Sequence, residues 1–139
     1  MVLALPFGLA SGFYQWTAPP SGLSLLRTAV IAFFLPAVFE ELVFRGPLLW
    51  AQTNLDEVPA WAIGLSLAAF VAWHPINAHT LLPQADPVFL DVRFLAIAAL
   101  LGAVATLMAL KTRSLWPPIL FHWSVVVGWK ATLGAPGFL

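Results

Sequence analysis

The chain contains no cysteine, which excludes disulfide bonds, thiol nucleophiles and thiolate metal sites. Charge is also scarce, because Asp, Glu, Lys and Arg make up 9% of its 139 residues, against roughly 25% in soluble domains. Six basic and six acidic residues leave no net charge, so nothing suggests a nucleic-acid partner. The 61% of hydrophobic residues and the mean hydropathy of +0.92 therefore predict a protein whose main partner is the lipid bilayer.

Twelve prolines and nine glycines interrupt the apolar runs. In lipid, a broken helix is tolerated only where protein or water takes up the freed backbone groups. Since a span needs about 20 apolar residues, we expect an all-α, polytopic transmembrane helical bundle of about four to five spans with proline-broken helices. The candidate spans are a poor one at 2–16 and better ones at 23–50, 60–73, 92–110 and 115–133, within one domain over 1–139.

Between the spans, the stretch 75–91 is rich in proline and polar residues and is predicted to be a loop or a re-entrant segment. Lys111–Ser114 is predicted to be a polar turn, with Ser114 as the N-cap of the last span.

Glu40 and Glu41 lie next to each other inside the apolar run 25–50. A carboxylate in hydrocarbon is costly unless it is paired, protonated or next to water. Arg45 follows Glu41 by four residues, so on a helix it lies on the same face and can pair with it. Glu40 is rotated by about 100° and has no cation nearby in the sequence. We therefore expect Glu41–Arg45 to be a structural ion pair and Glu40 to carry chemistry.

His74 and His122 can meet Glu40 at intermediate depth if the proline-bearing helices tilt or break. One carboxylate with two imidazoles admits two chemistries. Glu40 can act as a general base on water, with a histidine orienting the water or stabilising an oxyanion. Alternatively, Glu40, His74 and His122 can bind zinc and leave an open position for water. The soluble H-E-x-x-H motif is absent, and no cofactor is favoured, although zinc stays open.

Three fragments match the motifs of a known family in order and spacing. They are EELVFR at 40–45, FVAWH at 70–74 and SLWPPILFH at 114–122. They resemble the E-E-x-x-x-R, F-x-x-x-H and late-histidine motifs of the CAAX protease and bacteriocin-processing family, also called the Abi family. The resemblance covers about residues 25–130, nearly the whole chain.

The resemblance implies an intramembrane endopeptidase that uses glutamate, although members have also been regarded as metalloproteases. Glu40 would activate the water, His74 would help to hold it, and His122 would stabilise the oxyanion. Supporting roles fall to three residues: Glu41, Arg45 and Phe70.

At one position the chain departs from the family pattern. The family often has Asn or Asp four residues after the last histidine, where this chain has Val126. Asn77 or Ser124 could supply the missing oxyanion donor instead. Without such a donor, the rate of an acyl-transfer step falls by about 10²–10³.

Two other functions remain open at the level of the sequence. One is a non-catalytic relative that acts as a membrane chaperone or immunity factor, which Val126 would suit. The other is a proton-coupled carrier that uses Glu40 and Glu41. For the protease, the expected partner is a peptide or protein substrate, prenylated or not, and the expected location is the prokaryotic cytoplasmic (inner) membrane.

Overall fold

The computed structural model describes residues 4–18, 20–50 and 58–133, and in these ranges every regular element is a helix. This confirms the all-α prediction. The elements are α1 (Ala4–Ala10), α2 (Gly22–Ala32), η1 (Phe33–Val38), α3 (Phe39–Phe44), α4 (Gly46–Trp50), α5 (Ala60–His79), η3 (Pro83–Ala85), α6 (Asp86–Phe89), α7 (Val92–Thr112) and α8 (Trp116–Thr132).

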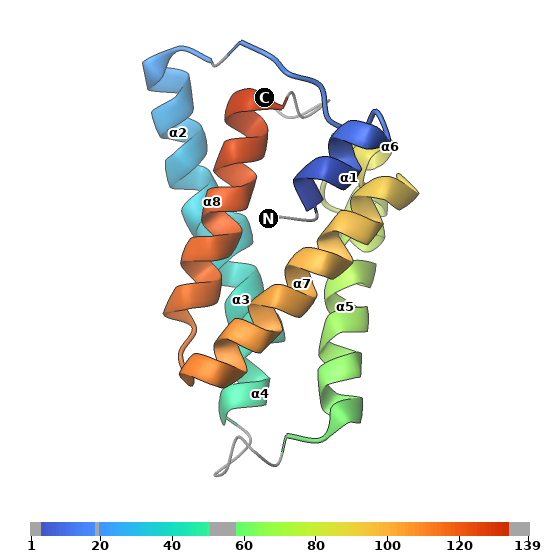
Figure 1. Ribbon diagram of the computed structural model, residues 1–139, viewed down its shortest axis with the longest axis vertical. Helices are drawn as coiled ribbons and strands as arrows, with labels where there is room; N and C mark the ends of the chain where they lie inside the picture. Colours follow the sequence, from blue (N-terminus) through green and yellow to red (C-terminus); the bar gives the residue numbers. More distant parts are fainter. Residues whose placement is uncertain (1–3, 19, 51–57, 134–139) are drawn as a thin grey trace.

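The elements α2, η1, α3 and α4 follow one another as a single long rod, with α8 packed along it (Figure 1). Helix α7 crosses the bundle obliquely and contacts α8 on one side and α5 on the other. Helix α5 in turn contacts α3. The glutamate pair of α3 therefore lies where three other helices, α5, α7 and α8, approach one another.

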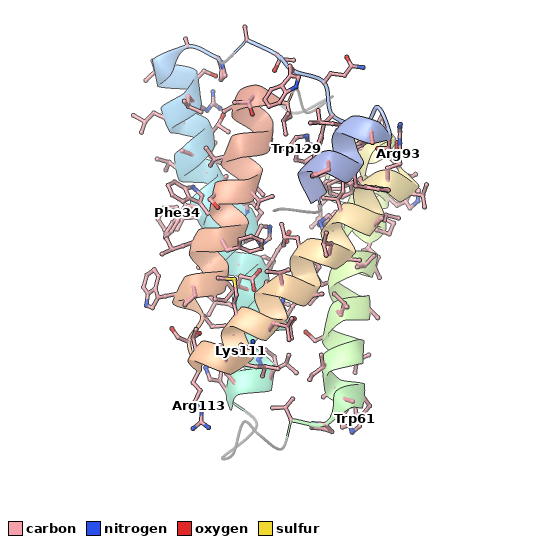
Figure 2. All side chains as sticks on the ribbon, viewed as in Figure 1. Phe34, Trp61, Arg93, Lys111, Arg113 and Trp129 are labelled. Atoms are coloured by element: carbon pink, nitrogen blue, oxygen red, sulfur yellow. The ribbon has the colours of Figure 1, made fainter. Side chains whose placement is uncertain are left out.

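Among the described residues, two helical segments are long and apolar enough to cross a membrane: the rod over Gly22–Trp50 and α7 over Val92–Thr112. The rod exposes large apolar side chains along its outer face, and Phe34, 61% exposed, points away from the bundle in Figure 2. An apolar face of this kind suits contact with lipid. Helix α8, with 17 residues, is shorter than a typical span of about 20, and the predicted count of four to five spans stays a prediction.

The rod is not a uniform α-helix, because η1 is a π-helical segment that contains Pro36. Its inward face shows the effect. Along a regular α-helix the same face returns after three or four residues. One row of buried residues along the rod instead takes a step of five across η1: Thr28, Ala32, Ala37, Glu41, Arg45 and Leu48, with Glu40 and Gly46 buried beside it.

The extra residue of the π-turn therefore rotates the side chains of α3 and α4 about the helix axis, compared with the directions they would have in a regular α-helix continued from α2. A proline has no backbone N–H to donate and its ring clashes with the preceding turn, and the wider π-turn relieves both problems. In a regular α-helix the face of Thr28 and Ala32 would continue to Pro36 and then Glu40. With η1 in place, both Glu40 and Glu41 are buried.

The third predicted span continues further than expected. It was expected to finish at Trp73 or a little beyond, but α5 continues through Pro75 to His79. Pro75 deprives the carbonyl of Val71 of its usual helix donor. The ring of His74 lies near the carbonyls of Phe70 and Val71, with Nδ1 3.0 Å from the oxygen of Phe70. The helix tolerates the proline here, so the segment predicted over 75–91 as a loop or re-entrant piece begins only after His79, and it contains the short helices η3 and α6.

Both ends of the bundle differ from the predicted pattern. In the described part of the candidate span at 2–16, residues 4–16, the regular element is α1, whose seven residues cover roughly 10 Å, about a third of the hydrocarbon core of a bilayer. The chain after α1 lies on the end of α8, where Thr17 N donates to the carbonyl of Thr132 at 2.9 Å.

At the predicted polar turn, α7 runs on to Thr112 and ends at Arg113, whose φ of 53° is left-handed. Ser114 is not the N-cap residue of α8, which is Leu115, although its hydroxyl does accept from Trp116 N at 3.2 Å.

Asp91 fixes the start of α7. Its side chain accepts from Arg93 N at 2.8 Å and also pairs with the Arg93 guanidinium. That guanidinium in turn donates to the carbonyl of Ser11 at 3.0 Å, which ties the segment after α1 to α7. The hydrogen bonds from Arg93 hold the pKa of Asp91 below its usual value.

We expect Asp91→Ala to lower the free energy of unfolding by about 1 kcal/mol, because it removes the helix cap. Asp91→Asn keeps an acceptor oxygen but loses the charge. Since the folded pKa of Asp91 is depressed, its charge stabilises the fold above about pH 4, the unfolded pKa. That stabilisation is lost as the pH falls toward the folded pKa. Unfolding followed by circular dichroism in detergent should show wild type and Asp91→Asn converging at low pH; a constant difference would contradict this.

Candidate active site

The two adjacent glutamates of α3 have different surroundings. Glu41 is fully buried, and its Oε1 accepts from Arg45 Nη1 at 3.3 Å and from His122 Nδ1 at 2.9 Å. Glu40 is 8% exposed and has no arginine within ion-pair distance among the described residues. This arrangement agrees with the expected Glu41–Arg45 pair and adds His122 as a second partner of Glu41.

Arg45 ends α3 and is itself fully buried. Besides Glu41, its guanidinium donates to the carbonyl of Gly102 at 3.0 Å and to the hydroxyl of Thr106 at 3.3 Å. Its Cζ lies 4.1 Å from the ring centroid of Phe70, a cation–π contact. A buried charge is tolerated only when it is paired and hydrogen-bonded, and Arg45 meets both conditions.

His122 on α8 bridges the two acids. Its Nδ1 contacts Glu41, and its Nε2 lies 3.9 Å from Glu40 Oε2. An ionised carboxylate can only accept, so the bond to Glu41 assigns the hydrogen to Nδ1. The other ring nitrogen, Nε2, therefore faces Glu40. The imidazole is 3% exposed, which keeps competing water away from both contacts.

Glu40 itself is less fully engaged than its neighbour. The Trp73 indole on α5 lies near its carboxylate. Its Oε2 is buried and, within the described part of the chain, has no hydrogen-bond partner. A buried polar atom left without a partner costs free energy, so it marks a place where a water molecule or a substrate group fits.

His74 on α5 lies among aromatic rings. Ring centroids of Phe70, Phe89 and Phe94 lie 5.3, 5.2 and 5.0 Å from its imidazole. Because a carbonyl oxygen can only accept, the contact with Phe70 O assigns a hydrogen to Nδ1 and leaves Nε2 of the neutral ring as an acceptor. Phe70, 1% exposed, also lies 6.0 Å from the ring of His122 and so packs between the elements of the site.

The two residues considered as replacement oxyanion donors lie in different environments. Asn77 is buried, and its Oδ1 has no hydrogen-bond partner among the described residues. Ser124 is exposed, and its hydroxyl donates to the carbonyl of Phe121 in its own helix at 2.8 Å. Ser124 is therefore not brought into the site. Val126, one turn beyond His122, is half-buried and offers no donor.

A zinc site would need Glu40, His74 and His122 to converge on one point at about 2 Å from each donor. Within the described ranges, no three His, Asp or Glu side chains are grouped closely enough to hold a metal ion. His74 instead directs Nδ1 to a backbone carbonyl, and His122 uses Nδ1 for Glu41. In this arrangement the three residues do not fit zinc.

Sequence reasoning missed Gly102 and Thr106, which supply two of the acceptors around Arg45. A signal was present, because two small residues four apart on an apolar helix often mark a close helix–helix approach. Neither residue type, however, indicates which side chain it receives.

The two glutamates should respond differently to the same substitution. Glu41→Gln leaves the buried Arg45 without its charge partner, so we expect a loss of about 3–5 kcal/mol in the free energy of unfolding. Glu40→Gln removes a charge that no arginine pairs with, and we expect a change within about 1 kcal/mol. Denaturant titrations in mixed micelles, read by tryptophan fluorescence, test the difference. Equal losses would contradict the assignment of the two roles.

Comparison of the chain with known proteins shows which family it belongs to. No curated protein and no solved structure matches the chain. The family model described as type II CAAX prenyl endopeptidase Rce1-like matches residues 22–127, a segment that includes all three motif fragments. The match confirms the resemblance found in the sequence, and together with the apolar helices it indicates an integral membrane protein. The chain belongs to the Rce1-like family of type II CAAX prenyl endopeptidases.

Proposed function

We propose that this chain is an intramembrane endopeptidase in which Glu40 activates the attacking water. The observation that carries the proposal is the difference between two neighbouring acids. Glu41 is held by Arg45 and His122, whereas Glu40 keeps a buried oxygen without a partner among the described residues. That oxygen is therefore placed to accept a proton from a water molecule, whereas the Glu41 carboxylate is already engaged.

The reaction is the addition of water to a peptide bond. Glu40 takes a proton from the water as its oxygen attacks the scissile carbonyl carbon. The tetrahedral intermediate then breaks its C–N bond, and Glu40 returns the proton to the departing amine nitrogen. The products are a carboxylic acid and an amine, and Glu40 ends as it began.

His122 is suited to the oxyanion of that intermediate. With Nδ1–H donating to Glu41, the ring must also be protonated at Nε2 to donate to an oxyanion. The donor is fixed before the charge develops, and such preorganised donors contribute most to acyl transfer.

His74 is proposed to hold the water. Its Nε2 is an acceptor when Nδ1 donates to Phe70, so it can accept one hydrogen of the water while Glu40 accepts the other. The ring needs no charge for this role, which suits its aromatic surroundings.

Family membership and the composition suggest the wider setting. We propose that α5 and α8 also cross the bilayer, which with the rod and α7 gives the four spans of the lower prediction. Residues 1–139 then form one membrane domain of a prokaryotic inner membrane, a location supported by the motif set and the absence of cysteine. The substrate is a peptide or protein segment at the membrane, with a prenylated C-terminal tail favoured by the family.

One observation favours a second candidate. Val126 replaces the polar residue that the family often has one turn after the last histidine, and a valine cannot donate to an oxyanion. A member without that donor could bind membrane proteins as a chaperone or immunity factor and not cleave them.

Glu40→Gln should reduce peptide cleavage by about 10²–10⁴-fold, because it removes the general base while keeping the side-chain shape. The measurement is cleavage of prenylated and unprenylated peptides by protein in nanodiscs, with and without a chelator. Asp91→Asn, the same chemical change away from the site, is the matched control and should cleave like wild type. Full activity in Glu40→Gln would overturn the assignment of the base, and loss of activity under chelator would favour a metal. If wild type cleaves nothing across the panel, the non-catalytic function is favoured.

Val126→Asn should raise kcat, up to the roughly 10²–10³-fold that one oxyanion donor contributes. Position 126 is one helical turn from His122 on the same face of α8, so an amide there is placed to donate beside Nε2. Single-turnover rates of wild type, Val126→Asn and Val126→Leu separate the donor from a simple change of size. A rate for Val126→Asn no higher than that of Val126→Leu would show that no donor is missing.

A further inference from the structure

Helix α7 contributes no residue to the family motifs, yet one turn of it holds the centre of the site. The carbonyl of Gly102 accepts from Arg45 Nη2 at 3.0 Å, and the hydroxyl of Thr106 accepts from Arg45 Nε at 3.3 Å. Thr106 is 2% exposed and Arg45 is fully buried, so water does not compete for these bonds. Within the part of the chain that the structure describes, two of the three polar contacts of the guanidinium therefore come from α7.

The hydroxyl of Thr106 is itself fixed in direction. It donates to the carbonyl of Gly102 at 2.8 Å, one turn earlier in the same helix. Its single hydrogen is thus used within α7, and its lone pairs face Arg45. Because its hydrogen is already used, the Thr106 hydroxyl can only accept from Arg45, and the guanidinium of Arg45 can only donate.

Gly102 permits the close approach. A Cβ at this position would lie 2.9 Å from Arg45 Nη2, 2.9 Å from Phe70 Cδ1 and 2.8 Å from Leu67 Cδ1. Real side chains do not pack that closely, so any larger residue would push α7 away from Arg45 or displace the ring of Phe70.

The contacts continue from Arg45 to the histidine. Arg45 Nη1 binds Glu41 Oε1 at 3.3 Å, and the same oxygen accepts from His122 Nδ1 at 2.9 Å. The position of Arg45 thus decides where Glu41 lies, and Glu41 decides which nitrogen of His122 carries hydrogen and which one faces Glu40. Buried polar networks of this kind act as a unit, because each member fixes the next.

We propose that Gly102 and Thr106 are positioning residues of the hydrolytic site, which hold Arg45 so that Glu41 orients His122 toward Glu40. The effect on turnover rests on the proposed function, but the effect on His122 does not. Neither residue touches the reacting atoms; they act through Arg45 and Glu41.

The first test is spectroscopic and needs no substrate. The chain has three histidines, so ¹⁵N-histidine labelling gives a spectrum that single substitutions can assign. Thr106→Val keeps the size of the side chain and removes the hydroxyl, and we expect the imidazole signals of His122 to shift while those of His79 do not. Thr106→Ser keeps the hydroxyl and should retain the wild-type signals. Thr28→Val is the matched control, since the Thr28 hydroxyl is buried without a hydrogen-bond partner among the described residues.

The second test is kinetic. Thr106→Val and Gly102→Ala should each lower kcat by roughly 10–100-fold with little change in KM, because a catalytic group misplaced by about 1 Å can cost as much as 10²-fold. Thr106→Ser and Thr28→Val should turn over like wild type. A loss shared by Thr28→Val would indicate a general effect of buried substitutions and would overturn the proposal.

The outcomes separate this proposal from the proposed function. Unchanged His122 signals in folded Thr106→Val overturn the positioning role, whatever the protein cleaves. If wild type cleaves nothing but His122 shifts as expected, the positioning role stands and the protease assignment fails. If Thr106→Val does not fold, the His122 signals of Thr106→Ala and Thr106→Ser are compared instead, because these two variants differ only in the hydroxyl. Identical His122 signals in that pair would also overturn the proposal.

Discussion

A guanidinium buried among apolar helices has to satisfy its donors from the protein, and the arrangement of this bundle follows from that requirement. Arg45 draws one carboxylate from its own helix, a carbonyl and a hydroxyl from α7, and the face of Phe70 from α5. His122 of α8 joins through the shared carboxylate of Glu41. One ion pair thus brings four helices to a common point, and in lipid no water could replace any of these contacts.

The same pair explains why two adjacent acids can do different things. Glu41 is committed to the structure, because its removal would strand a buried charge. Glu40, one residue earlier, shares the apolar surroundings but not the arginine. Among the described residues, the ion-pair contact of Glu40 is with Nε2 of His122, at 3.9 Å. The contrast arises from the 100° rotation between neighbouring residues on a helix, so a simple doublet in the sequence yields one structural and one reactive carboxylate.

Much of this was predictable from the sequence. The spacing of Glu41 and Arg45 on one helical face indicated their pair, and the apolar runs located the long rod and α7. The continuation of α5 through Pro75 was not predictable, because a proline inside an apolar run usually ends or kinks a helix, and here the helix runs through it. Gly102 and Thr106 were missed for a related reason. A glycine and a threonine in an apolar run look like ordinary packing residues until the guanidinium they receive is in place.

The π-turn at Phe33–Val38 has a consequence for comparing this chain with its relatives. An extra residue within the π-turn increases the number of residues between α2 and α3. The buried faces of both helices nevertheless keep their positions in the bundle. A relative with a regular α-helix here can therefore keep the same site with one residue fewer between its counterparts of Ala32 and Glu41. The spacing of Glu40, Glu41 and Arg45 is fixed by their contacts, whereas the number of residues between the face of α2 and this motif can differ by one. An alignment gap at this point would mark a difference in helix geometry and not in chemistry.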